Sequence, residues 1–331
     1  AQMPNMKISG VGMCVPDRVV TNHELEPLLN TDDEWIQQRT GIVERRWVPE
    51  GVQLSDLALT ASQEALEKAG CGAEEIDMIL FATLSSEMAF PGTGVFLQAK
   101  LGIKNTPALD IRNQCSGFLY GLSVAKGMIC SGMYKKILLV GAEIQSRGIL
   151  KIPQGRDTTV IFADGAGAVV LEASEDETGV IDVYLGADGR HAEELCAAGM
   201  GSRWEGFVTP EMMETKSHHP YMNGRHVFKY AVTRMPKTIQ TICERNQVQI
   251  SDIDVLIPHQ ANLRINEMVA KTLGLEDKAF NNIQKYGNTT AATIPLCIYE
   301  ALQEGFLKPG HLLALTAFGS GFTWGSALIR M

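Results

Sequence analysis

The sequence predicts a layered α/β protein, and two observations lead to this fold class. Apolar runs of strand length alternate with amphipathic helical patterns along the whole chain. In addition, a glycine-rich turn followed by a strand of small and β-branched residues occurs twice, as DGAGAVVL (164–171) and FTWGSALI (322–329). The repetition leaves an internal duplication open, since strand and helix patterns alone do not decide it.

The elements follow from local apolar periodicity, which alternates every second residue in strands and every third or fourth in helices. The first half is predicted to contain a strand at 6–13, a helix at 55–70, strands at 77–84 and 107–113, a helix from about 115 to 131, a strand at 135–143 and a strand pair around 160–173. The second half is predicted to contain a strand at 180–189, helices at 224–246, 261–273 and 291–304, and strands at 254–259, 311–319 and 322–331. The segment 190–222 is long and rich in methionine and turn residues, which is typical of a functional or mobile loop.

Composition excludes several classes of protein. A chain of 331 residues with 45% apolar content can bury the core of one large domain or of two of about 150 residues each. The net charge of −9 is spread along the chain, which argues against nucleic-acid binding. The chain also lacks an apolar run of about 18 residues and an apolar core near its start, so we expect no membrane association and a cytoplasmic location.

The seven cysteines are widely spaced and form no C-x-x-C pair. No histidines accompany them at metal-finger spacing, so we expect neither disulfides nor a metal site. Most free cysteines are small core residues, and Cys130 is interpreted in this way.

Cys115 is the candidate exception, because it lies where a buried strand ends and a helix begins. The unpaired N–H groups at a helix N-terminus favour a thiolate, so we expect a lowered thiol pKa and a nucleophilic cysteine. Taken alone, this position is more often held by an inert buried cysteine.

Three further strand-to-turn junctions carry residues suited to acyl chemistry. His259 follows the strand 254–259, and Asn288 opens the helix 291–304. Singly, a structural histidine and a helix-capping asparagine explain them equally well. The glycines of 317–326 leave a backbone N–H free to bind an oxyanion. Together the four junctions predict a cysteine that holds an acyl group, and His and Asn donors that stabilise an enolate.

The chain resembles β-ketoacyl-acyl carrier protein synthase III, of the thiolase-like superfamily, over nearly its whole length. The resemblance rests on long ordered motifs: TDDEWIQQRTGIVER (31–45), AFPGTG (89–94), NQCSGF (113–118), IFADGAGAVVL (161–171), VFKYAV (227–232), PHQANLRI (258–265), YGNTTAA (286–292) and FGSGFTWGSALIR (318–330).

The resemblance implies a five-layered αβαβα core of two similar halves, 1–175 with the cysteine and 176–331 with His and Asn, in a homodimer. It implies that an acyl-CoA primer acylates Cys115 and that malonyl-acyl carrier protein then enters. His259 and Asn288 would assist decarboxylation, and the backbone N–H groups of Cys115 and Ser320 would form the oxyanion hole. No cofactor is expected beyond the CoA thioester substrate.

The resemblance also assigns binding residues. Trp35, Arg39, Arg156 and Asn262 are expected to hold CoA, since an indole face and guanidinium groups suit adenine and phosphate. Phe90 is expected to reach across the dimer and limit the neighbour's primer pocket. The carrier protein is expected to meet a local basic patch of Lys229, Arg264 and Lys271.

The chain departs from well-known members of the family in two places. The segment 190–222 is longer than usual, and Asn113 and Gln114 precede the cysteine where small residues are common. We expect the long segment to border the acyl channel, so these departures leave the primer chain length open. Acetyl-CoA is the default primer, and a longer or branched acyl-CoA, used in specialised metabolism, is the alternative. A non-catalytic acyl-shuttling scaffold is disfavoured because Cys, His and Asn occur together, and no protease context surrounds Cys115.

Overall fold

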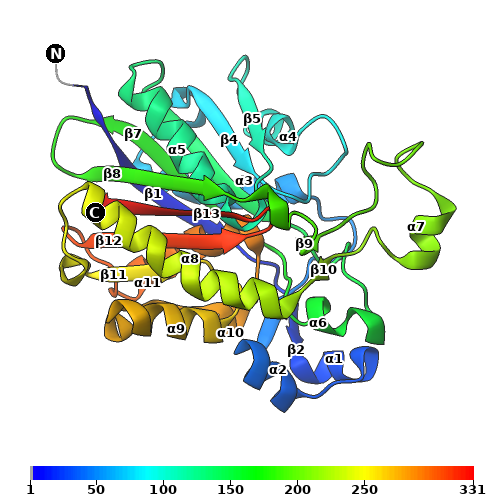
Figure 1. Ribbon diagram of the computed structural model, residues 1–331. Helices are drawn as coiled ribbons and strands as arrows, with labels where there is room; N and C mark the ends of the chain where they lie inside the picture. Colours follow the sequence, from blue (N-terminus) through cyan, green and yellow to red (C-terminus); the bar gives the residue numbers. More distant parts are fainter. Residues whose placement is uncertain (1–2) are drawn as a thin grey trace.

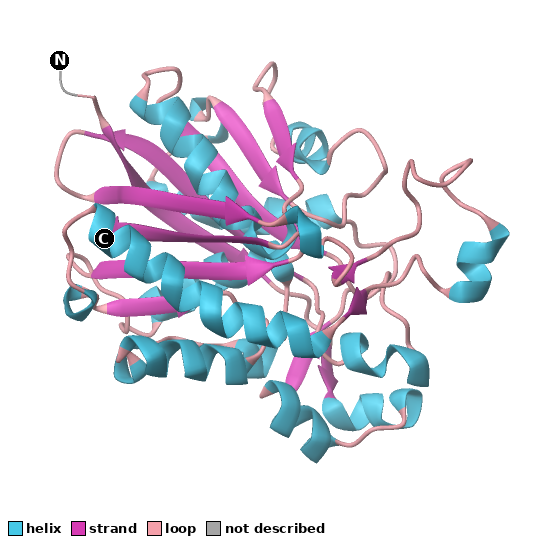
Figure 2. Cartoon of the chain, viewed as in Figure 1, coloured by secondary structure: helices cyan, strands magenta, loops and turns pink. Residues whose placement is uncertain are grey.

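Two β-sheets lie face to face with helices between them and on both outer sides (Figures 1 and 2). The computed structural model describes residues 3–331. The first sheet has the order β1-β7-β6-β4-β5, with bounds Asn5–Cys14, Gly165–Ser174, Lys136–Glu143, Met78–Ala82 and Ala108–Ile111. The second has the order β8-β13-β12-β11, with bounds Gly179–Ala187, Thr323–Arg330, Leu312–Gly319 and Val255–Pro258.

The two sheets repeat one topology. In the first, β7 pairs antiparallel with β1 and β6, while β4 runs parallel to β6. In the second, β13 pairs antiparallel with β8 and β12, while β11 runs parallel to β12. The similar sequences 164–171 and 322–329 thus occupy equivalent strands, β7 and β13. The fold consists of two similar halves, and the predicted boundary at 175/176, which stays a prediction, falls in the turn between β7 and β8.

Helices complete five layers. The middle layer is α5 (Gly117–Cys130) and α11 (Thr293–Gln303), whose apolar side chains share one core cluster with both sheets. One outer layer is α3 (Leu54–Ala69) with α4 (Thr93–Lys100), and the other is α8 (Gly224–Arg245) with α9 (Leu263–Leu273). The expected αβαβα arrangement is therefore confirmed.

Glycines in β1 let α3 approach the first sheet closely. A Cβ atom added to Gly10 would lie 2.2 Å from the carbonyl oxygen of Ala65, and one added to Gly12 would lie 2.0 Å from that of Ala61. A side chain at either position would therefore push α3 away from the strand.

A smaller subdomain gathers short elements around its own apolar cluster, on the lower right of Figure 1. It contains β2 (Val19–Thr21), α1 (Asn22–Leu29), α2 (Asp33–Thr40), β3 (Glu44–Arg46), α6 (Arg156–Thr159) and α10 (Ile283–Tyr286). None of these elements was predicted, because each is too short to show a clear period.

The 3₁₀ turns are η1 Ala73–Glu75, η2 Gln114–Ser116, η3 Pro153–Gly155, η4 Gly189–His191, η5 Ile250–Asp252, η6 Glu276–Lys278 and η7 Thr290–Ala292.

The structure corrects two sequence predictions. The segment 160–173, predicted as a strand pair, contains one strand, β7, which begins at Gly165. The residues before it form a turn around the buried carboxylate of Asp164 instead of a second strand. That carboxylate accepts hydrogen bonds from the backbone N–H groups of Val48, Gln145 and Ser146. The helix predicted from 115 begins with η2, so Cys115 lies in a 3₁₀ turn.

The segment 190–222 is mostly turns, as predicted, and it extends from the body of the protein (Figure 1). Its regular elements are β9 (Leu195–Cys196), which pairs with β10 (Tyr221–Met222), and α7 (Pro210–Thr215). Within residues 3–331, every helix is too short or too polar to cross a membrane.

We predict that Gly12→Ala lowers the stability of the fold, because the new methyl group overlaps the Ala61 carbonyl of α3. Overpacking of this kind costs roughly 1–3 kcal/mol, measurable as a lower urea midpoint. The matched control is Gly127→Ala on the exposed side of α5, where no atom lies within 4 Å of the added Cβ. An unchanged midpoint for Gly12→Ala would contradict the close packing of β1 and α3.

Candidate active site

Cys115 is buried at the junction of the two halves. It lies in η2, between β5 and α5, after Gln114, whose φ of 47° turns the chain sharply. Gly319, at the end of β12 in the other half, presses against it: an added Cβ would lie 2.3 Å from Cys115 Cβ and 2.7 Å from Sγ. Only a residue without a side chain fits there, so β12 brings its backbone to the thiol.

Burial sets the protonation state of this thiol. It raises the pKa of Cys115 to about 12, although hydrogen bonds from the backbone N–H groups of Ser320 and Cys115 itself lower it. The predicted lowering of the thiol pKa is therefore wrong, because desolvation outweighs the donors at the start of the helix. The thiol is neutral in the free protein, and the two N–H groups expected to form the oxyanion hole both act at Sγ.

The turn that carries Ser320 is anchored to the segment 190–222. The Ser320 hydroxyl donates to the carbonyl oxygen of Leu195 in β9 over 2.6 Å. The carbonyl of Ser320 accepts a hydrogen bond from the Thr323 hydroxyl over 3.1 Å. The position of the Ser320 N–H therefore depends on β9 as well as on its own turn.

His259 follows β11 and is almost completely buried. Its backbone N–H donates to Thr316 of β12, and ring atom Nδ1 lies 2.6 Å from the Thr293 hydroxyl. Nε2 is buried without a hydrogen-bond partner. Because burial lowers the pKa of His259 to about 3, the imidazole is neutral near pH 7.

Asn288 is held by its backbone and by its side-chain oxygen. Its N–H and C=O pair with Ile161 and Ala163 of the turn before β7. Its Oδ1 accepts the backbone N–H of Thr290 over 2.8 Å. The carboxamide thus caps the η7 turn locally through its oxygen, and its Nδ2 is the group left for a ligand.

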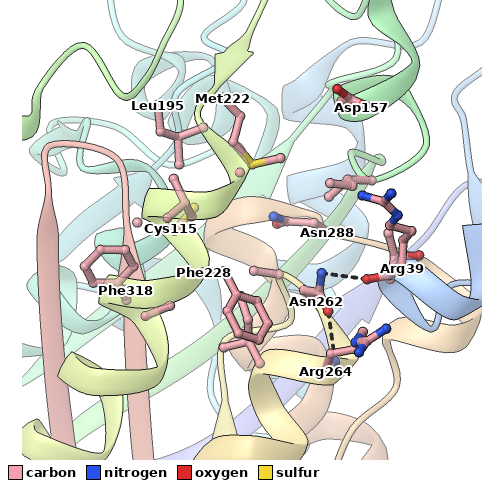
Figure 3. A pocket seen from close by; sticks show the side chains of 18 of the residues that line it. Arg39, Cys115, Asp157, Leu195, Met222, Phe228, Asn262, Arg264, Asn288 and Phe318 are labelled. Carbon is pink, nitrogen blue, oxygen red and sulfur yellow. Dashed lines mark hydrogen bonds between the residues drawn. The ribbon is translucent and has the colours of Figure 1, made fainter.

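Cys115 and Asn288 line one cavity of about 510 Å³ (Figure 3). In this view Asn288 lies between Cys115 and Arg39. The cavity wall is largely apolar and is formed by Val160, Ile161, Phe162, Leu195, Met222, Val227, Phe228, Ala231, Met235, Ile265 and Phe318. Its basic lining residues are Arg39, Arg225 and Arg264, so an acidic chain presents local positive charge to the ligand.

The residues expected to hold CoA lie together. The guanidinium carbons of Arg39 and Arg156 lie 5.1 and 4.5 Å from the ring centroid of Trp35. The side chain of Asn262 is already engaged: Nδ2 donates to the Arg39 carbonyl over 2.9 Å, and Oδ1 accepts the Arg264 N–H over 2.8 Å (Figure 3). Asn262 therefore joins α2 to the start of α9.

Of the other predicted binding residues, Arg264 lines the cavity, and Phe90, Lys229 and Lys271 do not. Phe90 is 85% exposed in the loop between β4 and α4 and does not line this cavity. Lys229 on α8 and Lys271 on α9 are exposed. Arg264, predicted with these two lysines, instead lines the cavity, and its guanidinium donates to the Gln38 carbonyl.

Sequence analysis missed a buried acid near the thiol, Glu143 at the end of β6. Its carboxylate accepts hydrogen bonds from the Thr83 and Ser85 hydroxyls at 2.6 and 2.8 Å and, over 3.4 Å, from the Ala291 N–H. Burial raises the pKa of Glu143 to about 7. An acid ending the apolar run KKILLVGAE was the available signal. Arg225 was also missed, because no pattern separates an arginine that lines a cavity from one on the surface.

Among residues 3–331, no group of three or more His, Cys, Asp or Glu side chains could hold a metal ion. Two similar halves that meet over a buried thiol, with a long cavity leading to it, form the architecture of thiolase-like acyltransferases. The protein is an enzyme of this class.

Comparisons with known proteins narrow the class to a family. The family model of 3-oxoacyl-[acyl-carrier-protein] synthase III matches residues 109–189, and the model of its C-terminal part matches 243–331. The β-ketoacyl-[acyl-carrier-protein] synthase III of Caldanaerobacter subterraneus subsp. tengcongensis is 43% identical over 98% of this chain and 97% of its own. The chain belongs to the β-ketoacyl-acyl carrier protein synthase III family, as the motifs predicted.

Solved structures agree. The synthase III from Aquifex aeolicus is 40% identical, with a TM-score of 0.91 over 98% of this chain and 100% of that one. The priming β-ketosynthase of the R1128 polyketide pathway is 28% identical, with a TM-score of 0.90 over 99% and 97% of the two chains. Structures of Xanthomonas campestris OleA, at 20% identity or less, share the fold.

We predict that Glu143→Gln weakens the pH dependence of stability between pH 4.5 and 7. The folded protein keeps the Glu143 proton up to about pH 7, whereas the unfolded chain loses it near 4.5. The wild type therefore loses stability relative to the variant as pH rises through this window, by about 3 kcal/mol in total. Urea unfolding of both proteins from pH 4.5 to 7.5 measures the difference, and parallel curves would contradict it.

Proposed function

We propose that this enzyme condenses an acyl-CoA primer, acetyl-CoA by default, with malonyl-acyl carrier protein and so starts type II fatty acid synthesis. Family membership supports the reaction. The observation that carries the residue roles is the cavity, which joins Cys115 to the cluster of Trp35, Arg39 and Arg156 and passes Asn288. No cofactor is needed beyond the thioester itself.

In the first half-reaction, Cys115 Sγ attacks the thioester carbonyl of the primer. The bond from that carbonyl carbon to the CoA sulfur breaks, and the cysteine proton leaves with CoA as its free thiol. The negative oxygen of the tetrahedral intermediate, on the carbon bound to Sγ, would accept hydrogen bonds from the backbone N–H groups of Cys115 and Ser320. The support for this assignment is that both N–H groups already reach Sγ in the free enzyme. Such fixed donors stabilise an oxyanion without reorganisation.

In the second half-reaction, malonyl-acyl carrier protein loses CO₂, and the electrons of the broken bond form an enolate on its thioester oxygen. Neutral His259 and the Asn288 Nδ2 group donate hydrogen bonds to that oxygen. The enolate carbon then attacks the acyl-cysteine carbonyl, and the Cys115 sulfur leaves as a thiolate, which takes a proton from solvent. The lowered pKa of His259 supports this role, because a neutral imidazole can donate a hydrogen bond to the enolate oxygen without transferring a full proton to it.

The protein is proposed to act as a homodimer through the β5 edge of the first sheet. An unpaired strand edge invites pairing with another chain. Around it, Leu109 in β5 and Met88, Phe90 and Val95 nearby are exposed apolar side chains. In such a dimer Phe90 would limit the partner's primer pocket, and Lys229, Arg264 and Lys271 would receive the acidic carrier protein.

A cytoplasmic location is proposed because all seven cysteines are free, as expected in a reducing compartment. A longer or branched primer is the second candidate substrate. The observation that favours it is the contribution of Leu195 and Met222, from the segment 190–222, to the cavity wall.

We predict that wild-type protein mixed with acyl-CoAs gains the mass of one acyl group and that Cys115→Ser gains none. Intact-protein mass spectrometry measures both. Faster adduct formation with acetyl-CoA than with longer chains supports fatty acid initiation, and the reverse order supports the second candidate. Equal adducts on Cys115→Ser and wild type would refute the covalent role of Cys115.

We predict that His259→Ala and Asn288→Ala still form the acyl adduct but lose decarboxylation of malonyl-acyl carrier protein by roughly 100-fold or more. The reason is that both donors face the enolate, which exists only in the second half-reaction. Release of ¹⁴CO₂ from labelled malonyl-acyl carrier protein measures the loss. Variants that failed first at acylation would contradict this division of roles.

A further inference from the structure

The hydroxyl of Thr293, the first residue of α11, lies between two partners. It is 2.6 Å from Nδ1 of His259 and 3.0 Å from the carbonyl oxygen of Thr290. A hydroxyl has one hydrogen, so it can donate to only one of them at a time. The choice decides which nitrogen of the neutral imidazole carries the proton.

The Thr290 carbonyl does not need this hydrogen. It already accepts the backbone N–H of Thr293, which closes the η7 turn. His259 Nδ1 has the hydroxyl as its partner and lies at the shorter of the two distances. Donation to Nδ1 therefore leaves both Nδ1 and the Thr290 carbonyl with a hydrogen-bond partner and places the ring hydrogen on Nε2.

The same turn orients the second enolate donor. The backbone N–H of Thr290 holds Oδ1 of Asn288, and Gln145 Nε2 donates to the Thr290 hydroxyl over 2.7 Å. Thr290 has a φ of 53°, a conformation rare for a β-branched residue. The buried η7 turn therefore contacts both proposed donors. The Thr293 hydroxyl orients the His259 ring, and the Thr290 N–H orients the Asn288 carboxamide.

We propose that Thr293 is a positioning residue of the condensation step: its hydroxyl donates to Nδ1 of His259 and so keeps the hydrogen on Nε2, the form that can donate to the enolate. The inference rests on the proposed role of His259. Without the hydroxyl, the ring loses both its anchor and its bias toward this tautomer.

Thr293→Val, which keeps the shape of the side chain, tests the inference against Thr293→Ser, which restores the hydroxyl. We expect Thr293→Val to acylate Cys115 at the wild-type rate and to release CO₂ from malonyl-acyl carrier protein about 10- to 100-fold more slowly. Thr293→Ser should recover most of that rate. The matched control is Thr238→Val, which removes another buried hydroxyl. That hydroxyl is bonded to the Met235 carbonyl and the Thr316 hydroxyl and has no hydrogen bond to the imidazole.

The outcomes separate the two proposals. If His259→Ala loses decarboxylation while Thr293→Val matches Thr238→Val, the role of Thr293 is wrong and that of His259 stands. If His259→Ala decarboxylates normally, the proposed function of His259 itself fails.

Nitrogen NMR of wild-type protein labelled with ¹⁵N-histidine gives a readout that does not depend on how a variant folds. We expect the His259 signals to show the hydrogen on Nε2, in the free enzyme and after acetylation. A hydrogen on Nδ1 in the acetylated enzyme would overturn the inference.

Discussion

Exclusion of water from the junction of the two halves is the constraint on which the chemistry depends. The same burial raises the pKa of Cys115 and lowers that of His259, so both groups are neutral before substrate binds. A neutral imidazole and a neutral thiol form no ion pair, in contrast to cysteine proteases, which use a thiolate and an imidazolium. Negative charge on the substrate therefore arises only during the reaction, and the backbone N–H groups of Cys115 and Ser320 are proposed to stabilise it.

Close approach of backbone segments from the two halves buries this junction. Gly319 touches Cys115 from the second half, and a Cβ on Gly141 in β6 would lie 2.1 Å from the Ala291 carbonyl. Polar groups buried there are paired with one another: Glu143 with Thr83 and Ser85, Gln145 with Thr290. Nε2 of His259 is buried without a hydrogen-bond partner, and it is the atom that the proposed function assigns to the substrate.

The sequence predicted the layered fold because its long strands and helices carry strong apolar periods, as in β6 and α8. It also singled out Cys115 and His259, since each follows a strand, and Asn288, which follows the short helix α10 and opens a turn. Cys115 and Asn288 do line one cavity, and the catalytic roles of all three residues stay a prediction. It did not predict the short elements around Trp35, whose packing depends on distant residues such as Val160. The thiol pKa was predicted in the wrong direction because desolvation depends on the other half of the chain. Thr293 was missed because its role comes from a contact across 34 positions in the chain.

The bond between Ser320 and Leu195 ties substrate range to catalytic rate. Leu195 belongs to the cavity wall, while its carbonyl accepts the hydroxyl of Ser320, whose backbone N–H is the proposed oxyanion donor. A change in the 190–222 segment that reshapes the wall therefore also moves a donor. Under the proposed roles, a substitution in this segment that changes primer preference is expected to lower turnover as well, unless a second substitution restores the bond to Ser320.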